Sequence, residues 1–309
     1  MVILVHPIDK FFSKLEDHKH HESEALSTAI DRFLSEVSIR LNDLGLDSKK
    51  PSSEILSFRW IKRCIALLRV QHRAFAKLIV EIDYPLRKQD ASSGDDFLKY
   101  TLKLLELLNS ISSSLSHLGQ VRLELSHALS LVDSSPSSAI DRLKPIESSS
   151  FTRDSIKGDG TGEICLEVAK SGKDSVVYRS LMIMQQISLW VCGIVISGLS
   201  GNAEPLMGLR KSAGKLGVSS LNRLDSIVHQ EICESGVRLK EVKEANDAVE
   251  LLVASMAAGK TRDAAEDLQK RLEILEKEMD DLRKEVDSLF SDVLEERSKL
   301  LDCLRQINQ

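Results

Sequence analysis

The stretch DLQKRLEILEKEMDDLRKEVDSLFSDV (267–293) decides the fold of this chain. Its apolar residues recur at alternating steps of four and three, and charged residues fill most positions between them. This pattern places one apolar stripe along a helix and is typical of a coiled-coil-like seam. The seam positions are Leu268, Leu272, Leu275, Met279, Leu282, Val286, Leu289 and Val293. We expect one long helix at about 262–306, which packs either in this chain's own bundle or on a second copy, so homo-oligomerisation stays open.

Apolar residues also recur at helical spacing upstream, over 22–44, 51–82 and 95–132. The last of these predicts a helix of about 55 Å, because a helix rises about 1.5 Å per residue. The chain has only 15 Gly and 6 Pro in 309 residues, and aromatic residues make up 4%. Such a composition excludes most all-β folds, which need many turns. The predicted fold is all-α: an elongated antiparallel bundle of long helices with a coiled-coil-like C-terminal helix.

Shorter elements are predicted between these long helices. Pro136 is suited to the first turn of a short helix, because proline there loses no hydrogen bond. The glycine-rich segment 208–217 predicts a connection between helices. The sequence after it predicts one continuous helix over 219–258, whose charged residues, Glu241 among them, form a solvated face.

The chain is expected to divide into four parts. Residues 1–50 form an N-terminal helix and variable region, and 51–146 form a first helical half. The segment ESSSFTRDSIKGDGTG (147–162) lacks apolar periodicity and is rich in Ser, Gly and charge, so it predicts a flexible linker. Residues 163–309 form a second helical half, which contains the C-terminal heptad helix.

The segment 181–201 contains no charged residue and is long enough to cross a bilayer. Its Gln and Ser residues, Ser188 among them, disfavour a lipid environment, where unpaired polar groups are costly. A buried central helix of a bundle has the same composition. We expect burial, beneath the Phe97 face and the Leu268 face of the neighbouring helices, and membrane insertion is the alternative.

The sequence contains little that indicates catalysis or cofactor binding. His18, His20 and His21 lie close together, but no further ligands complete a metal site. The glycine-rich segments 157–163 and 208–217 lack the residues of calcium and phosphate loops. We therefore expect no catalytic, cofactor-binding or metal-binding residue, and an enzyme is the least favoured class.

Charge and cysteine content bear on partners and compartment. The net charge of −5 gives no indication of nucleic-acid binding. The five cysteines are scattered and form no CxxC pair, which fits a reducing compartment. The N-terminal residues lack the apolar run of a secretion signal. We expect a cytoplasmic protein that is not secreted, and the 181–201 segment leaves membrane association open.

Three serines are candidate phosphorylation sites. Ser135 precedes Pro136, and Ser149 and Ser150 lie in the predicted linker. A phosphate group there would add charge that orders a loop or recruits a phospho-reader. Serine is also common in turns for conformational reasons alone, so this assignment remains a hypothesis.

Two stretches carry a family resemblance. EILSFRWIKRCIALLRVQHRAFAKLI (54–79) resembles an early helix of the plant BYPASS-like proteins, and DDFLKYTLKLLELLNSISSSLSHLGQ (95–120) is similar to their next helix. The order of later landmarks also agrees, through a Ser-Pro-initiated short helix to an apolar helix ending in ISGLSG (196–201). The resemblance covers roughly 50–309.

The resemblance implies a plant-specific helical protein that regulates growth and development. It also implies that no catalytic residue transfers to this chain, and it links some relatives to the exocytic machinery. We therefore expect a non-enzymatic regulatory or scaffold protein that acts through helix-mediated protein interactions. The alternative is a membrane-anchored adaptor of exocytic trafficking that uses 181–201 as its anchor. Expected partners are proteins, including the exocytic machinery or phospho-readers.

Overall fold

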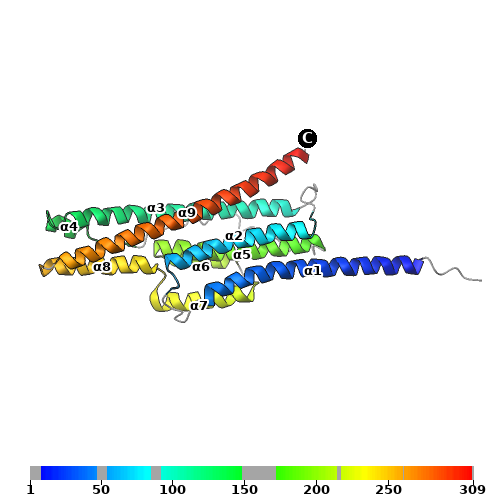
Figure 1. The fold of residues 1–309 in the computed structure, drawn as a ribbon, viewed down its shortest axis with the longest axis horizontal. Helices are drawn as coiled ribbons and strands as arrows, with labels where there is room; N and C mark the ends of the chain where they lie inside the picture. Colours follow the sequence, from blue (N-terminus) through cyan, green and yellow to red (C-terminus); the bar gives the residue numbers. More distant parts are fainter. Residues whose placement is uncertain are drawn as a thin grey trace, which may run out of the picture.

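The computed structural model describes residues 8–46, 54–84, 92–147, 172–213, 217–259 and 261–307. Within these ranges the chain forms nine helices and no strand, which confirms the all-α prediction (Figure 1). The helices are α1 (Ile8–Leu46), α2 (Phe58–Glu81), α3 (Ser92–Ser130), α4 (Pro136–Arg142), α5 (Lys173–Ser200), α6 (Glu204–Ala213), α7 (Ser219–Ser235), α8 (Lys240–Ala257) and α9 (Arg262–Ile307).

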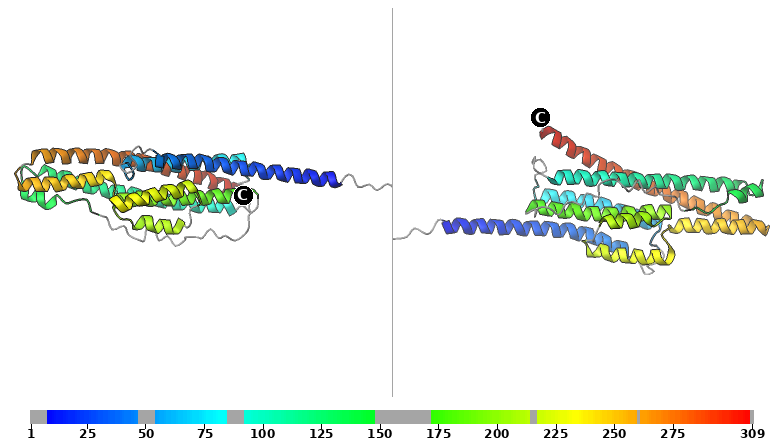
Figure 2. Two further views of the ribbon diagram at one scale, coloured as in Figure 1. Left: turned by 90° about the horizontal axis from the view of Figure 1, so that it is seen from below. Right: turned by 180° about the vertical axis from the view of Figure 1, so that it is seen from behind.

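The helices form an elongated bundle (Figure 1). The first half of α1 extends beyond the end of the other helices, as Figure 2 shows from two further sides. Neighbours in the sequence such as α1 and α2, or α8 and α9, run antiparallel (Figure 1). Helices α2 and α9 run parallel, because Lys62 pairs with Glu278 and Arg69, one heptad later, pairs with Glu285.

Helix α5 forms the apolar centre of the bundle. Every residue from Ile187 to Ser200 is buried, and α5 packs against α1, α2, α3 and α6. Phe97 lies on α3, so the α3 part of the expected covering is observed. The Leu268 face of α9 instead packs mainly against α2, α3 and α8, and the remaining neighbours of α5 are α1, α2 and α6.

The seam of α9 lies in the interior of the bundle. All eight seam side chains from Leu268 to Val293 are at most 3% exposed and belong to one contiguous apolar core. That core includes residues of α1, α2, α3 and α5, so it spans both sides of the predicted linker. Apolar burial of this extent is the main stabilising contribution to a helical bundle.

The predicted helix over 219–258 is broken into α7 and α8 at Gly236. This glycine has φ +76°, a value that other residues rarely adopt. The break lets two backbone N–H groups bond to other parts of the chain: Leu239 donates to the carbonyl of Gly198, and Lys240 donates to that of Leu56. Tertiary hydrogen bonds thus replace those that a continuous helix would make.

The predicted connection 208–217 begins in a helix. Helix α6 extends to Ala213, and Leu209 on it is buried in the core. Arg210 forms a 2.6 Å ion pair with the buried Asp225 of α7. Packing and this ion pair therefore outweigh the low helix propensity of Gly208. The short helix α4 begins at Pro136, as the sequence predicts.

Several predicted features fall outside the described residues. These include all but Glu147 of the predicted linker 147–162, together with Ser149 and Ser150. The side chains of His18, His20 and His21 are also outside the described part, although α1 includes their backbone.

Candidate functional site: a polar layer in the helical core

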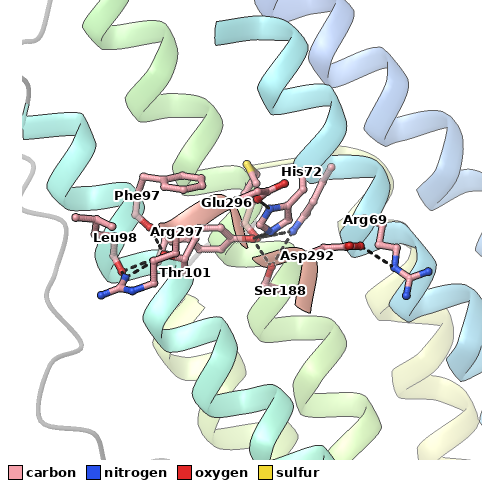
Figure 3. Close-up of polar contacts among 12 residues, drawn as sticks. Arg69, His72, Phe97, Leu98, Thr101, Ser188, Asp292, Glu296 and Arg297 are labelled. Carbon is pink, nitrogen blue, oxygen red and sulfur yellow. Dashed lines mark hydrogen bonds and ion pairs between the residues drawn. The ribbon is translucent and has the colours of Figure 1, made fainter. Parts of the chain in front are cut away.

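Five polar side chains from four helices meet within the core of the bundle (Figure 3). They are Gln71 and His72 of α2, Tyr100 of α3, Ser188 of α5 and Glu296 of α9. We call this set the polar layer. Gln71, His72, Tyr100 and Ser188 are all buried, whereas Glu296 is about two-fifths exposed, with a side-chain exposure of 39%. The layer therefore runs from the centre of the bundle to its surface.

Short hydrogen bonds connect the whole layer. The side-chain amide of Gln71 donates to Ser188 Oγ at 2.8 Å and lies 3.2 Å from the Tyr100 hydroxyl. The Tyr100 hydroxyl is 3.1 Å from Ser188 Oγ and 2.9 Å from His72 Nε2. His72 Nδ1 lies 2.8 Å from Glu296 Oε2. Each member but the terminal Glu296 thus has at least two polar partners inside the layer, while the side-chain oxygen of Gln71 is buried without a hydrogen-bond partner.

The chemistry of the two end groups fixes two donors. The Glu296 carboxylate only accepts, so His72 Nδ1 donates to it. At the other end, the side-chain amide of Gln71 donates to Ser188 Oγ. The hydroxyl groups of Tyr100 and Ser188 can each donate and accept, so they link these two ends.

The array resembles a proton relay, but its interior members are sealed from solvent. Burial raises the pKa of the Tyr100 hydroxyl well above its ordinary value, while hydrogen bonds from Ser188 and Gln71 partly oppose the shift. A phenol in this environment stays protonated and is a poor base. His72 and Glu296 line a surface cleft of about 250 Å³, and this cleft is where the layer meets solvent.

Charged residues flank the layer where α9 crosses α2 and α3. Arg69 of α2 pairs with Glu285 at 3.0 Å and with Asp292 at 3.6 Å. Arg297 of α9 donates to the carbonyl of Leu98 and, at 3.2 Å, to the hydroxyl of the buried Thr101 (Figure 3). The polar layer and its flanks thus fix where α9 lies along α2 and α3.

The described residues contain no group of three His, Cys, Asp or Glu side chains that could hold a metal ion. Cys64 and Cys192 are fully buried, and burial raises the pKa of Cys192 to about 12. A thiol with so high a pKa is a weak nucleophile. His117 and His127 of α3 are both exposed, and His127 Nδ1 lies 3.3 Å from the guanidinium of Arg142.

The structure places Ser135, one of the predicted phosphorylation sites, at the N-cap of α4. Its side chain is partly exposed and makes no capping hydrogen bond, while its backbone N–H donates to the carbonyl of Leu131 at 2.8 Å. The hydroxyl is therefore not needed to start α4, which leaves it chemically available.

Helix α5 is the single described helix that is long and apolar enough to cross a membrane, and 89% of its most apolar window is buried within the bundle. Its polar groups find partners in the protein. Ser188 lies in the polar layer, Trp190 Nε1 donates to Asp225 at 3.0 Å, and Ser197 Oγ accepts the N–H of Leu206 at 2.9 Å. Hydrogen bonds of this kind offset the desolvation cost of the buried polar groups, so these groups do not oppose the packing.

Sequence reasoning did not identify the polar layer, although two signals point to it. Glu296 stands three residues after Val293, at the next step of the 4-3 seam, where an apolar residue is expected. His72 lies on the apolar stripe of α2. A polar residue on an apolar face predicts a buried partner, because an unpaired one is destabilising.

The fold and this site define an all-helical bundle protein whose long helices are aligned by a buried polar layer. The family model described as Protein BPS1 matches residues 83–302. That range is more than half of the 309 residues, and the chain belongs to the BPS1 family. The matched range 83–302 contains Tyr100, Ser188 and Glu296, whereas Gln71 and His72 precede this range.

Individual relatives come from plants. A protein of Oryza sativa subsp. japonica named UPF0496 protein 4 is 28% identical over 242 residues, which cover 70% of this chain and 52% of the relative. The protein of the same name from Oryza sativa subsp. indica is 27% identical over 270 residues, which cover 79% of this chain and 55% of the relative. "Protein BPS1, chloroplastic" of Arabidopsis thaliana is 25% identical over 240 residues, covering 73% and 67%. The chain spans about half the length of the two rice relatives, and no solved structure matches it.

Proposed function

We propose that this chain is a non-enzymatic regulatory or scaffold protein of plant growth and development that acts through helix-mediated protein interactions. Membership of the BPS1 family supports this role, together with the plant origin of its relatives. The developmental part rests on the resemblance of 54–79 and 95–120 to the BYPASS-like proteins. The fold supports a scaffold, because long packed helices present extended surfaces.

The burial of α5 is the observation that carries the proposal. A helix whose apolar surface is already covered by α1, α2, α3 and α6 gains little from entering a bilayer. Insertion would also separate Ser188 from Gln71 and Trp190 from Asp225. Both losses favour a bundle that works as a protein surface.

The non-enzymatic part is supported by the chemistry of the polar layer. Its hydroxyl groups, on Tyr100 and Ser188, are buried and contact other side chains of the layer instead of an open cavity. A catalytic nucleophile needs access to its substrate and an activated form, and burial acts against both.

Exposed apolar side chains are the natural contact points for protein partners. They occur on several helices and are at least two-fifths exposed: Ile39, Val80, Leu102, Leu123, Ile140, Met207, Leu251, Ile274 and Leu294. The proposed partners are proteins, including the exocytic machinery or phospho-readers that recognise Ser135, Ser149 or Ser150. We propose no nucleic-acid partner, because the net charge is −5.

Affinity purification of the 309-residue chain from plant extract tests the scaffold role. We expect specific proteins to co-purify with the native chain and to be lost with Leu275→Asp, which disrupts the bundle. If the same proteins bind both forms, they recognise unfolded chain and the proposal fails. Recovery of no protein above the background of an untagged extract would also contradict it.

The second candidate is a membrane-anchored adaptor of exocytic trafficking. The length and apolar composition of α5 favour it. Carbonate extraction of plant membranes separates the two candidates, because an inserted protein stays in the pellet. We expect the chain in the supernatant, and its retention in the pellet would favour the adaptor.

We propose the cytoplasm as the compartment of this chain. The Arabidopsis relative carries the word chloroplastic in its name, so the two compartments need to be compared directly. A fluorescent protein fused after residue 309 should give a diffuse cytoplasmic signal. A signal confined to chloroplasts would contradict the proposal.

A further inference from the structure

The seam of helix α9 is no longer part of the contiguous apolar core after Val293. Up to that residue, every seam position is apolar and lies in the contiguous core. The next seam position is Glu296, and the one after it, Leu300, is 8% exposed but lies outside that core. Leu294 is 46% exposed. We call residues 294–307 the arm; Figure 1 shows it diverging from α3.

Polar contacts join the arm to α2 and α3. Glu296 accepts from His72, and Arg297 donates to Leu98 and Thr101. Arg69 pairs with Asp292, one turn before Glu296, and marks the edge of the polar contacts. The last pair of the arm, Glu295 with Lys299, lies within the arm itself and does not contribute to docking.

We propose that the arm is a releasable strap and that the polar layer is its latch. An apolar side chain that leaves the core exposes its surface to water, which costs free energy. A polar contact at a half-exposed site costs less to break, because hydrogen bonds to water replace it. The arm can therefore undock while the seam from Leu268 to Val293 stays in place. Release widens access to the His72 edge of the polar layer, beside the exposed Arg73, in the cleft that the arm lines.

The latch works by charge and is reversible. Asp292 on α9 faces the cationic Arg69 of α2, and Glu296 accepts from His72. The exposed fractions of the two carboxylates, 55% and 39%, leave them accessible to dissolved ions. Salt weakens such pairs and leaves apolar contacts intact or strengthens them. Release of the arm should therefore depend on ionic strength, in contrast to the seam.

Amide hydrogen exchange on the 309-residue chain tests the proposal. Raising salt from about 0.1 M to about 1 M shortens the Debye length from about 10 Å to about 3 Å. We expect exchange in peptides from 294–302 to become several-fold faster, while exchange in 268–293 stays unchanged. Salt-independent exchange in the arm, or equal acceleration in both segments, would overturn the proposal.

Variants of the latch make the test specific. Glu296→Ala should accelerate exchange in the arm at low salt to the rate that high salt produces in the native chain. Glu295→Gln is the control, because it removes one negative charge from the arm while the ion-pair partner of Glu295 is Lys299 of the same arm. If the two variants behave alike, the arm responds to its own charge, and the latch does not exist.

A double variant tests the opposite direction. His72→Leu with Glu296→Leu replaces the polar pair by apolar side chains, an exchange that proteins often tolerate well. We expect slower exchange in the arm and loss of its salt dependence. An arm that keeps its salt dependence in this variant would refute the latch, and circular dichroism verifies that the variant is helical.

Discussion

The carboxylate of Glu241, in the first turn of α8, accepts the backbone N–H of Phe58, the first residue of α2, at 3.1 and 3.2 Å. The two residues are 183 positions apart. Ser57 caps the same helix by accepting the N–H of Trp60, and Leu56 accepts the N–H of Lys240. The sequence predicted a solvated face for Glu241, and that prediction was wrong, because the break at Gly236 turns α8 toward the start of α2.

Glu241→Ala should destabilise the protein by about 1 kcal/mol, the usual loss when a helix loses its N-terminal cap. Glu241→Gln keeps an acceptor oxygen and should lose less. Chemical denaturation of both variants measures the difference. A stability of Glu241→Ala equal to the native value would show that Ser57 alone caps α2.

The stability contribution of Glu241 should fall as pH rises. Burial is the main cause that raises the pKa of its carboxyl above 4.5, with Glu278 and Glu244 adding to the shift and the Phe58 N–H opposing it. The folded chain therefore binds this proton more tightly than the unfolded chain. The contribution is complete below about pH 4.5 and is lost as pH rises through the folded-state pKa. Melting curves should show this loss in the native chain relative to Glu241→Gln.

Leu275→Asp should be severe, at a cost of several kcal/mol, because it places an unpaired charge in the apolar seam. Its neighbour provides the matched control, since Leu275 is fully buried and Ile274 is 48% exposed. Ile274→Asp should leave the melting temperature nearly unchanged. Thermal melts of the two variants that coincide would mean that the seam does not hold the bundle together.

Gly193→Val should destabilise the contact between α5 and α6. A Cβ atom at Gly193 would lie 3.2 Å from the backbone Cα of Leu206, so the helices would have to separate. Overpacking of this kind costs about 1–3 kcal/mol. Gly119→Val on α3 is the control, because a Cβ there meets nothing within 4 Å. Equal denaturation midpoints for the two variants would contradict the close approach of α5 and α6.

Limited proteolysis should cut first after Arg153 or Lys157, because the segment 147–162 has few apolar residues to offset its ordering entropy. The two fragments should stay together, since α2 and α3 pack against α5 and α9 across the cut. Gel filtration after cleavage measures their association. Fragments that separate would indicate two independent halves, and a first cut inside 95–132 would contradict the helix prediction there.

The sequence by itself determined the helical class and much of the core. The 4-3 spacing from Leu268 to Val293 predicts which side chains of α9 are buried, because a helix presents residues three and four apart on one face. Pro136 correctly marks the start of α4. These features depend on residues close together in the chain, so their spacing can be interpreted without knowledge of the fold.

Only the tertiary structure decided which polar side chains meet. His72 and Glu296 are 224 positions apart, and Gln71 and Ser188 are 117 apart. Periodicity indicates the face on which each residue lies, but it contains no information about which helices pack together or in which register. The break at Gly236 also depends on groups that are distant in the sequence. The carbonyl of Gly198 accepts the N–H of Leu239, and the carbonyl of Leu56 accepts the N–H of Lys240. Local patterns specify helices and faces, whereas the pairing of distant groups is fixed by packing.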